Sequence, residues 1–551
     1  MANVSQSGVA SIGQEIGLNA LGTNGLYGEK IRSALANAYG RNPVELSPLS
    51  PAPTYAASTI YGAGTVVRGS GADANNLYLC VGSTTNINAR GTSGAASPPT
   101  GISNANITDN NITWFYIGKT SSLGTYPLYS TVIPAASTDV MTGYVAFVAN
   151  SAVSTLGLTR SYTNNRTGAG PFARMGGHIR FDTTQAYIEP LSNWIGTLSG
   201  GNYTANRAFM EFTTSAQQWI GLQCIANMNG AYGADGTGRI DHYDIIVNGQ
   251  RLSESMIAFN NLGTAGGATP GSSASTLILD LTKFGNGNKT IRITSHGPNW
   301  GFQAPYLVFV KADEAVWATT PANNFKVSVE GDSIAQGGYF GQNFARWLIE
   351  HEIMDLLGFS RCINTGIGGT SCTNLTNGGK TLSTQGSAST VNTTFGERIR
   401  FITESGIPDI HVIFGFHNEV NNYQTAGLLA RRKAILQYMQ DCRAAWPNAL
   451  IVVLPFAPLT GDSYTTGGSQ SLFDLEADVF NQFTTFGDAN SLFIPTQSAS
   501  FPFYSTASAS TTSWYHSAGG SAPYNDSHPV TRFYPVFARV IADAIRRFYQ
   551  I

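Results

Sequence analysis

The sequence has few charged residues, few cysteines and no long apolar run. Only 12% of its 551 residues are charged and the formal net charge is −2, so it lacks the basic surface that nucleic-acid binding requires. No stretch approaches the roughly 18 consecutive apolar residues of a membrane-spanning helix, and we expect no membrane insertion. The amino-terminal segment has neither a basic nor an apolar region, which predicts synthesis in the cytoplasm without a signal peptide.

The cysteine content argues against a disulfide-rich protein and against a cysteine-bound metal site. There are five cysteines, an odd number, at positions that show no metal-ligand spacing: Cys80, Cys224, Cys362, Cys372 and Cys442. This pattern predicts thiols in a protein made in a reducing compartment rather than a disulfide framework. The histidines show no paired metal-ligand spacing either, so we expect neither a metal nor another cofactor.

A chain of 551 residues is too long for one hydrophobic core and should divide into several domains. Residues 1–53 contain a predicted helix at 28–40 and a Pro-rich connector, and are expected to serve in assembly or attachment. Residues 54–118 read as a small β module of short strands and Gly/Ser/Asn-rich turns. Two larger segments follow, at 119–320 and 321–551.

Residues 119–320 are predicted to be all-β, because short strand-like segments follow one another without helices between them. Asn248-Gly249 predicts a two-residue hairpin turn within 242–252. A second hairpin is predicted at 277–295, with its turn at 285–288. We expect a β-sandwich or jelly roll, which could bind carbohydrate.

Residues 321–551 alternate strands with helices, the pattern of a parallel sheet covered on both faces. Within 325–334, Val327 and Val329 alternate with polar neighbours and lead directly into Gly331-Asp332-Ser333. A serine at the carboxyl end of a first strand lies where open α/β sheets place their chemistry. Its hydroxyl is a weak nucleophile until a base removes the proton.

Three further segments follow in order: the glycine-rich 364–370, then Gly415-Phe416-His417-Asn418-Glu419, then Asn525-Asp526-Ser527-His528-Pro529. With the Gly-Asp-Ser block, these motifs make residues 324–551 similar to the SGNH (GDSL-type) hydrolases, a family of esterases and deacetylases. The resemblance implies a flavodoxin-like α/β domain. It also implies Ser333 as nucleophile, His528 as base, and an oxyanion hole made by Ser333, Gly369 and Asn418.

Two of these blocks depart from the family pattern. The third block usually reads G-x-N-D, whereas Phe416 stands here at the glycine position and Glu419 at the aspartate position. In the last block Asn525 lies three residues before His528, where the family has aspartate, and Asp526 lies two before it. Either residue can orient the imidazole, and we assign this role to Asp526.

The expected reaction is hydrolysis of acetyl esters on a bacterial surface polysaccharide such as O-antigen, capsule or exopolysaccharide. His417 adjoins the oxyanion-hole asparagine, and Trp514 and Tyr515 lie in an aromatic-rich segment before the histidine block, so all three are candidate substrate contacts. Trp114, Tyr116 and Gly118 end a segment that resembles a β module of bacteriophage tail fibres and tailspikes. That resemblance implies a virion location, other tail proteins as partners through the N-terminus, and a homotrimer.

Two other functions remain open. The protein could be a tail protein that binds a glycan receptor without turnover, which the Asn525/Asp526 irregularity favours. It could also be a bacterial carbohydrate esterase unrelated to any virion.

The last motif generates a prediction about the third member of the triad. Residues two apart face the same side of an extended segment, and Pro529 disfavours helical dihedrals at His528. Asp526→Ala should therefore lower kcat by several orders of magnitude, whereas Asn525→Ala should cost much less, as measured by steady-state ester hydrolysis. The reverse ranking would assign the role to Asn525, and two mild losses would indicate a Ser–His dyad.

Overall fold

The structure of the protein is a computed structural model. It describes residues 22–39, 52–61, 66–83, 91–95, 98–101, 107–119, 139–142, 145–163, 174–176, 180–181, 186–187, 209–224, 241–252, 257–259, 275–296, 307–320, 323–336, 349–366, 370–372, 383–384, 387–388, 395–404, 406–416, 419, 428–455, 472–496 and 533–551. Within these ranges, no helix is both long enough and apolar enough to cross a membrane.

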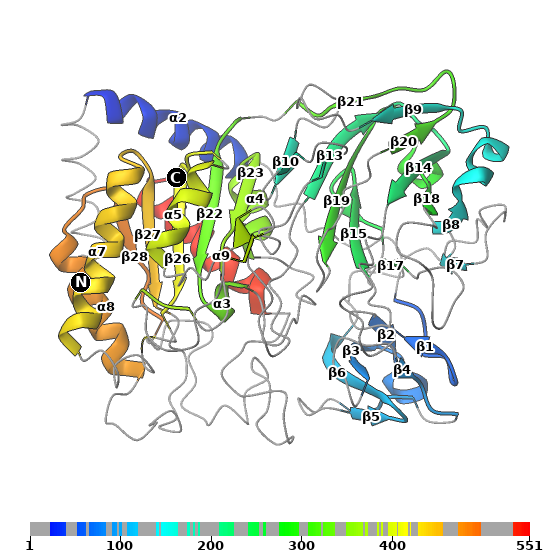
Figure 1. Ribbon diagram of the computed structural model, residues 1–551, viewed down its shortest axis with the longest axis horizontal. Helices are drawn as coiled ribbons and strands as arrows, with labels where there is room; N and C mark the ends of the chain where they lie inside the picture. Colours follow the sequence, from blue (N-terminus) through cyan, green and yellow to red (C-terminus); the bar gives the residue numbers. More distant parts are fainter. Residues whose placement is uncertain are drawn as a thin grey trace.

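A five-stranded parallel sheet organises the carboxyl-terminal part of the chain (Figure 1). Its strands are β22 (Lys326–Gly331), β23 (Arg361–Asn364), β26 (Ile410–Gly415), β27 (Leu450–Pro455) and β28 (Ser491–Phe493). Their spatial order, β23-β22-β26-β27-β28, is that of flavodoxin-like sheets, with the first strand in the chain placed second. The predicted parallel α/β architecture is thus present.

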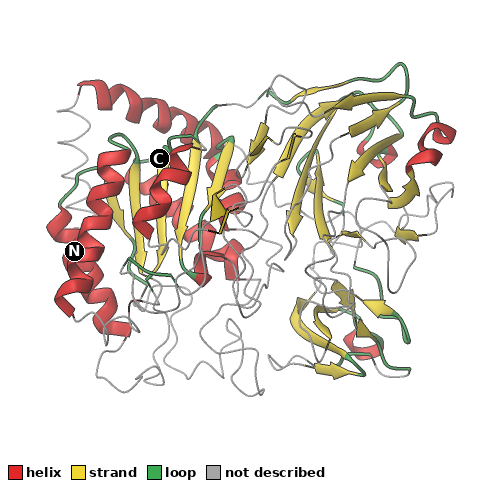
Figure 2. Ribbon diagram, viewed as in Figure 1, coloured by secondary structure: helices red, strands yellow, loops and turns green. Residues whose placement is uncertain are grey.

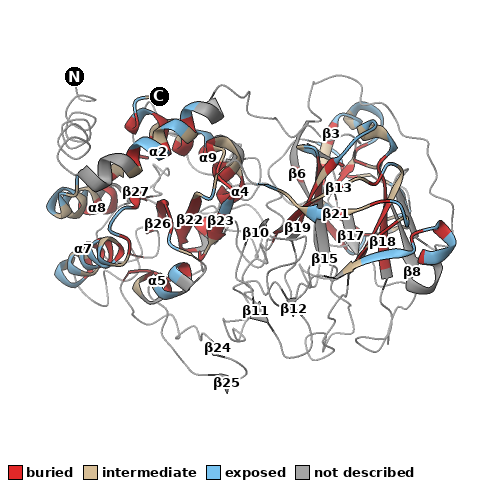
Figure 3. Cartoon of the chain, turned by 90° about the horizontal axis from the view of Figure 1, so that it is seen from above, coloured by how far each residue is buried: buried red, intermediate tan, exposed pale blue. Residues whose placement is uncertain are grey.

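Helices cover both faces of this sheet, as the view in Figure 3 shows. They are α3 (Ser333–Gln336), α4 (Ile349–Leu357), α5 (Phe395–Glu404), α7 (Leu428–Ala445), α8 (Leu472–Phe486) and α9 (Phe533–Phe548). Successive side chains of a strand point to opposite faces, so Val412 and Phe414 pack with α4 and α9, while Ile413 packs with α5, α7 and α8. Each face therefore has its own apolar core.

The amino-terminal helix α2 (Gly22–Tyr39) packs against the same part of the chain. It begins six residues earlier than the predicted start at 28. Ile31 and Leu35 are fully buried in the core that α4 and α9 share, and the rings of Tyr27 and Phe325 meet edge to face. The helix is thus part of the α/β core, and its role in assembly stays a prediction.

The segment between 139 and 318 forms two large antiparallel sheets, where strands predominate (Figure 2). One contains β10 (Arg174–Gly176), β13 (Phe209–Thr214), β15 (Asp241–Val247), β16 (Gln250–Arg251), β17 (Ile257–Phe259), β19 (Lys289–His296) and β21 (Val316–Ala318). The other contains β7 (Asp139–Thr142), β8 (Val145–Ala149), β9 (Arg160–Thr163), β14 (Trp219–Cys224), β18 (Ser275–Asp280) and β20 (Leu307–Val310). These sheets agree with the expected all-β unit, and the jelly-roll connectivity stays a prediction.

One predicted hairpin in this segment is confirmed and the other is wrong. Asn248 and Gly249 have φ angles of 51° and 79° and join β15 to its partner β16, as the Asn-Gly signal predicted. The segment 277–295 is not a hairpin, because β18 pairs with β14 and β8, whereas β19 pairs with β13 and β15. The glycine-rich turn at 285–288 therefore carries the chain from one sheet to the other.

The first β module has its own small core. Its strands are β1 (Ile60–Tyr61), β2 (Val66–Arg68), β3 (Asn76–Ser83), β4 (Gly91–Thr92), β5 (Ile107–Asp109) and β6 (Ile112–Lys119). Short antiparallel pairs β11 (Arg180–Phe181) with β12 (Ala186–Tyr187), and β24 (Ser383–Thr384) with β25 (Ser387–Ala388), lie elsewhere in the chain. Trp114 is fully buried in the module core, and its Nε1–H donates to Asp109.

Cys80, Cys362, Cys372 and Cys442 are buried and none of the four forms a disulfide, as the cysteine pattern predicted.

An ion pair joins the antiparallel sheet that contains β19 to the α/β part of the chain. Arg292 of β19 donates from both terminal nitrogens to the Asp355 carboxylate of α4 at 2.8 Å, and its Nε donates to Glu211 at 3.0 Å. Burial alone would lower the pKa of Arg292, but the two carboxylates raise it. This bidentate ion pair holds β19 and α4 in a fixed relative position.

Removing one carboxylate should destabilise this contact. Asp355→Ala leaves the buried guanidinium with one partner, so we expect the free energy of unfolding to fall by about 1.5–3 kcal/mol, measured by urea denaturation. The control is Asp543→Ala, whose carboxylate pairs with Arg546 one helical turn away and is 46% exposed. That substitution should cost about 0–1 kcal/mol. Equal losses in both variants would contradict the prediction.

Candidate active site

The candidate nucleophile lies where the order of the parallel sheet reverses. Ser333 is the first residue of α3, two residues beyond the carboxyl end of β22. The second motif block follows β23 and the third follows β26, and these two strands flank β22. Parallel strands end at the same edge of a sheet, so the first three predicted blocks meet at one edge, at the switch point that binds ligands in such folds.

Close packing around the Gly-Asp-Ser turn requires glycine at two positions. A Cβ on Gly331 would lie 1.7 Å from the Phe414 carbonyl oxygen of the neighbouring strand. Gly415 has a φ of +143°, and a Cβ there would lie 2.9 Å from the Asp332 carboxylate. Asp332 is fully buried, and its Oδ1 accepts the Ile334 N–H at 2.9 Å. The turn before the nucleophile is therefore held against β26 without room for a side chain.

Asn364, the first residue of the second block, connects that block to the nucleophile helix. Its Nδ2 donates to the Ala335 carbonyl oxygen at 2.7 Å and to Glu350 at 2.8 Å. Its Oδ1 accepts the Gly366 N–H at 2.7 Å, which turns the chain at the end of β23. One amide thus uses both of its ends to set the second block beside α3.

The structure shows how the third block accommodates the two residues that depart from the family pattern. Phe416, at the usual glycine position, has a φ of +68°, a left-handed conformation that glycine adopts without cost. A side chain there costs about 1–2 kcal/mol, and here the ring is fully buried against Phe395 at a centroid distance of 5.9 Å. Burial of an aromatic ring offsets a penalty of this size. Glu419, at the usual aspartate position, is fully buried and accepts the backbone N–H of Cys372, so it joins the third block to the second.

A buried polar network lies behind the nucleophile turn. Arg398 of α5 and Glu330 of β22 form an ion pair with a 3.0 Å separation between Nε and Oε1, and neither side chain is exposed. Tyr438 donates its hydroxyl proton to the other oxygen of Glu330 at 2.7 Å. Burial raises the pKa of Glu330 to about 7, and the Arg398 charge and the tyrosine hydrogen bond oppose this rise.

His411 of β26 extends the network and is not a candidate base. Its Nε2 lies 3.0 Å from the Tyr438 hydroxyl oxygen and its Nδ1 lies 2.8 Å from Ser328 Oγ, both in hydrogen bonds. When Glu330 is ionised, Tyr438 gives its proton to that carboxylate, and Nε2 then donates to the tyrosine while Nδ1 accepts from the serine. Burial, with a smaller effect from Lys326, lowers the pKa of His411 to about 3. The imidazole is therefore neutral and has both nitrogens occupied.

The other candidate residues lie outside the part of the chain that the structure describes. These are Gly369, His417, Asn418, Trp514, Tyr515, Asn525, Asp526 and His528. For Ser333 the structure describes the backbone. The catalytic roles given to all of them stay predictions.

The buried charges behind the turn were not predicted from the sequence. Phe395, Ile399 and Ile402 recur at helical spacing and mark the apolar face of α5, and Arg398 lies on that same face. A charge inside an apolar stripe is the signal that it has a buried partner. Glu330 gave no such signal, because Lys326, Ser328 and Glu330 alternate with valines as on a half-exposed strand, whereas all six residues of β22 are buried.

No family model and no curated protein matches the chain. Among solved structures, it is similar to a family two carbohydrate esterase from Clostridium thermocellum in complex with cellohexaose, with 13% identity over 64% of this chain and 96% of that one, at a TM-score of 0.38. An acetyl xylan esterase from the rumen bacterium Butyrivibrio proteoclasticus has 14% identity over 70% and 98%, at a TM-score of 0.41.

A salicylyl-acyltransferase from a tetracycline biosynthetic pathway has 12% identity over 71% of this chain and 98% of that one, at a TM-score of 0.46. At these identities and TM-scores the similarity assigns no chemistry to the site, which has to be argued from the residues of this chain.

The buried imidazole generates a prediction about acid stability. The folded pKa of His411 lies near 3 and the unfolded value near 6.5, so the unfolded state binds more protons between these values. The stability that this group contributes is complete above pH 6.5 and is lost as the pH falls, by up to about 1.4 kcal/mol per pH unit. His411→Asn should be less stable than wild type at pH 8 but should lose less stability between pH 7 and about 5.

The measurement is urea denaturation of both proteins across this pH range. The difference between them isolates His411 from Glu330, whose raised pKa acts in the opposite direction between 4.5 and about 7. Parallel pH profiles would show that the pKa of His411 is the same in the folded and unfolded states, which would contradict the prediction.

Proposed function

We propose that the protein is a serine esterase that removes O-acetyl groups from a carbohydrate. Ser333 is the nucleophile, His528 the general base and acid, and Asp526 the residue that orients the histidine. The observation that carries the proposal is the position of Ser333, at the start of α3 where the sheet order reverses. The glycine, asparagine and histidine blocks of the SGNH pattern accompany it in the same chain order.

In the proposed reaction, Ser333 Oγ attacks the carbonyl carbon of the acetyl ester while His528 accepts the hydroxyl proton. The tetrahedral oxyanion receives hydrogen bonds from the backbone N–H groups of Ser333 and Gly369 and from the Asn418 side chain. Loss of one such donor typically costs about 2.7–4 kcal/mol of transition-state stabilisation. His528 then protonates the sugar oxygen as the C–O bond breaks, and water, activated by the same histidine, releases acetate from Ser333.

The proposed substrate is an O-acetylated bacterial surface polysaccharide, with His417, Trp514 and Tyr515 as substrate contacts. We propose further that the protein acts in the virion, as a homotrimeric phage tail protein whose N-terminus joins other tail proteins. The tail-fibre-like ending of the 54–118 module supports this finer assignment. A glycan-binding tail protein without turnover and a bacterial esterase outside a virion are the competing functions.

Substitution of the nucleophile tests the activity directly. Ser333→Ala should abolish hydrolysis of p-nitrophenyl acetate, because triad knockouts typically lower kcat by about a millionfold. The control is Ser360→Ala, which removes a buried hydroxyl just before β23, at the amino end of the sheet, and should leave kcat within about twofold of wild type.

Residual Ser333→Ala activity above about a thousandth of wild type would contradict the assignment of the nucleophile. A wild-type protein that binds polysaccharide but shows no turnover would support the receptor-binding alternative instead. Acetate release from surface polysaccharides of different bacteria then identifies the substrate.

A further inference from the structure

Arg398 has more partners at the candidate active site than an ion pair with Glu330 requires. Its Nη1 donates to the Gly331 carbonyl oxygen at 3.1 Å and also to the Thr365 carbonyl oxygen. Its Nη2 donates to Thr370 Oγ1 at 2.9 Å. The guanidinium is fully buried and lies 4.9 Å from the centre of the Phe395 ring. One side chain therefore contacts Gly331 at the carboxyl end of β22, Thr365 directly after β23, and Thr370.

These partners adjoin the proposed oxyanion donors in the chain. Gly331 lies two residues before Ser333, and Thr370 directly follows Gly369. The Ser333 and Gly369 N–H groups come from segments that follow two different strands, β22 and β23. A planar guanidinium with fixed donor directions can set the separation of such loops, whereas a lysine ammonium cannot make the same set of bonds.

We propose that Arg398 is a positioning residue for the esterase reaction, which holds the nucleophile turn and the second-block loop at the separation that the oxyanion hole requires. It touches neither substrate nor reacting atoms. Glu330 and Tyr438 hold the guanidinium from behind, so the buried network serves the reaction as well as stability. The inference rests on the proposed function.

The test is Arg398→Lys, which keeps a positive charge beside Glu330 but loses the forked donors. A shift of about 1 Å in catalytic groups can cost 10²-fold in rate. We expect kcat for p-nitrophenyl acetate to fall by about 10- to 100-fold with KM changed less than about threefold, because the substrate contacts are untouched. The pH at which kcat is half-maximal should stay unchanged, since His528 still supplies the proton transfer.

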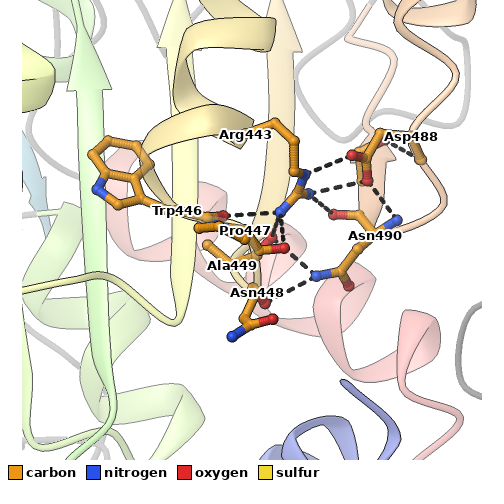
Figure 4. A network of polar contacts seen from close by, with 8 residues as sticks. Arg443, Trp446, Pro447, Asn448, Ala449, Asp488 and Asn490 are labelled. Atoms are coloured by element: carbon orange, nitrogen blue, oxygen red, sulfur yellow. Dashed lines mark hydrogen bonds and ion pairs between the residues drawn. The ribbon is translucent and has the colours of Figure 1, made fainter. Parts of the chain in front are cut away.

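Arg443 provides a matched control at the opposite edge of the sheet (Figure 4). Its Nη1 donates to the carbonyl oxygens of Trp446, Pro447 and Ala449 at 2.8–3.0 Å, and its Nη2 and Nε bind Asp488. Ala449 precedes β27, so these bonds lie at the amino ends of the strands, away from Ser333. Arg443→Lys should lower the melting temperature about as much as Arg398→Lys while kcat stays within about twofold of wild type.

A second variant covers the case in which Arg398→Lys does not fold. Thr370→Val keeps the shape of the side chain but removes the oxygen that accepts from Arg398, and it should lower kcat about tenfold in a folded protein. The inference is overturned if a folded Arg398→Lys or Thr370→Val retains kcat within about twofold of wild type, or if Arg443→Lys loses as much kcat as Arg398→Lys.

The outcomes separate this inference from the proposed function. If wild type hydrolyses the ester and Ser333→Ala does not, the proposed function stands and the Arg398 and Thr370 variants decide the inference alone. If wild type has no turnover, or Ser333→Ala retains it, both the proposed function and the positioning role are overturned.

Discussion

The carboxyl-terminal sheet depends on a tight contact between Gly331 and the backbone of β26. A Cβ on Gly331 would lie 1.7 Å from the Phe414 carbonyl oxygen, so the two central strands meet at their carboxyl ends with no side chain between them. Parallel pairing of β22 with β26 runs up to this point, from Val327 to Gly331. Because Ser333 lies only two residues further on, the backbone of this candidate nucleophile is positioned by strand pairing rather than by a loop. A site held in this way depends on rigid elements.

The same strand carries polar side chains into the interior, on the face of the sheet that α5 and α7 cover. A fully buried Glu330 is costly unless it is paired, and Arg398 and Tyr438 supply the partners. Tyr438 in turn engages His411, so the network extends from α5 through β22 to β26 and α7. Apolar residues would pack this space at lower cost. The retention of charges directly behind a candidate catalytic turn is better explained by the loops that Arg398 holds.

Much of this architecture could be predicted from the sequence, because its signals are local. The parallel α/β architecture of 321–551 was predicted from its alternation of strands and helices, since buried parallel strands are short apolar runs between turns. The prediction of a hairpin at 277–295 was wrong, because a glycine-rich turn has the same sequence pattern whether its two strands pair with each other or belong to separate sheets. The partner of a strand is a long-range property, as is the pairing of Arg398 with Glu330, 68 residues earlier.

The departures of the third block show how a motif can change while its geometry is kept. The family's glycine permits a left-handed backbone, and Phe416 adopts that backbone with a φ of +68° because its ring is buried in the core beneath α5. The family's aspartate is replaced by Glu419, whose longer side chain reaches the Cys372 N–H across to the second block. Phe416 and Glu419 are thus both held by contacts outside the third block, the first in the apolar core and the second at Cys372.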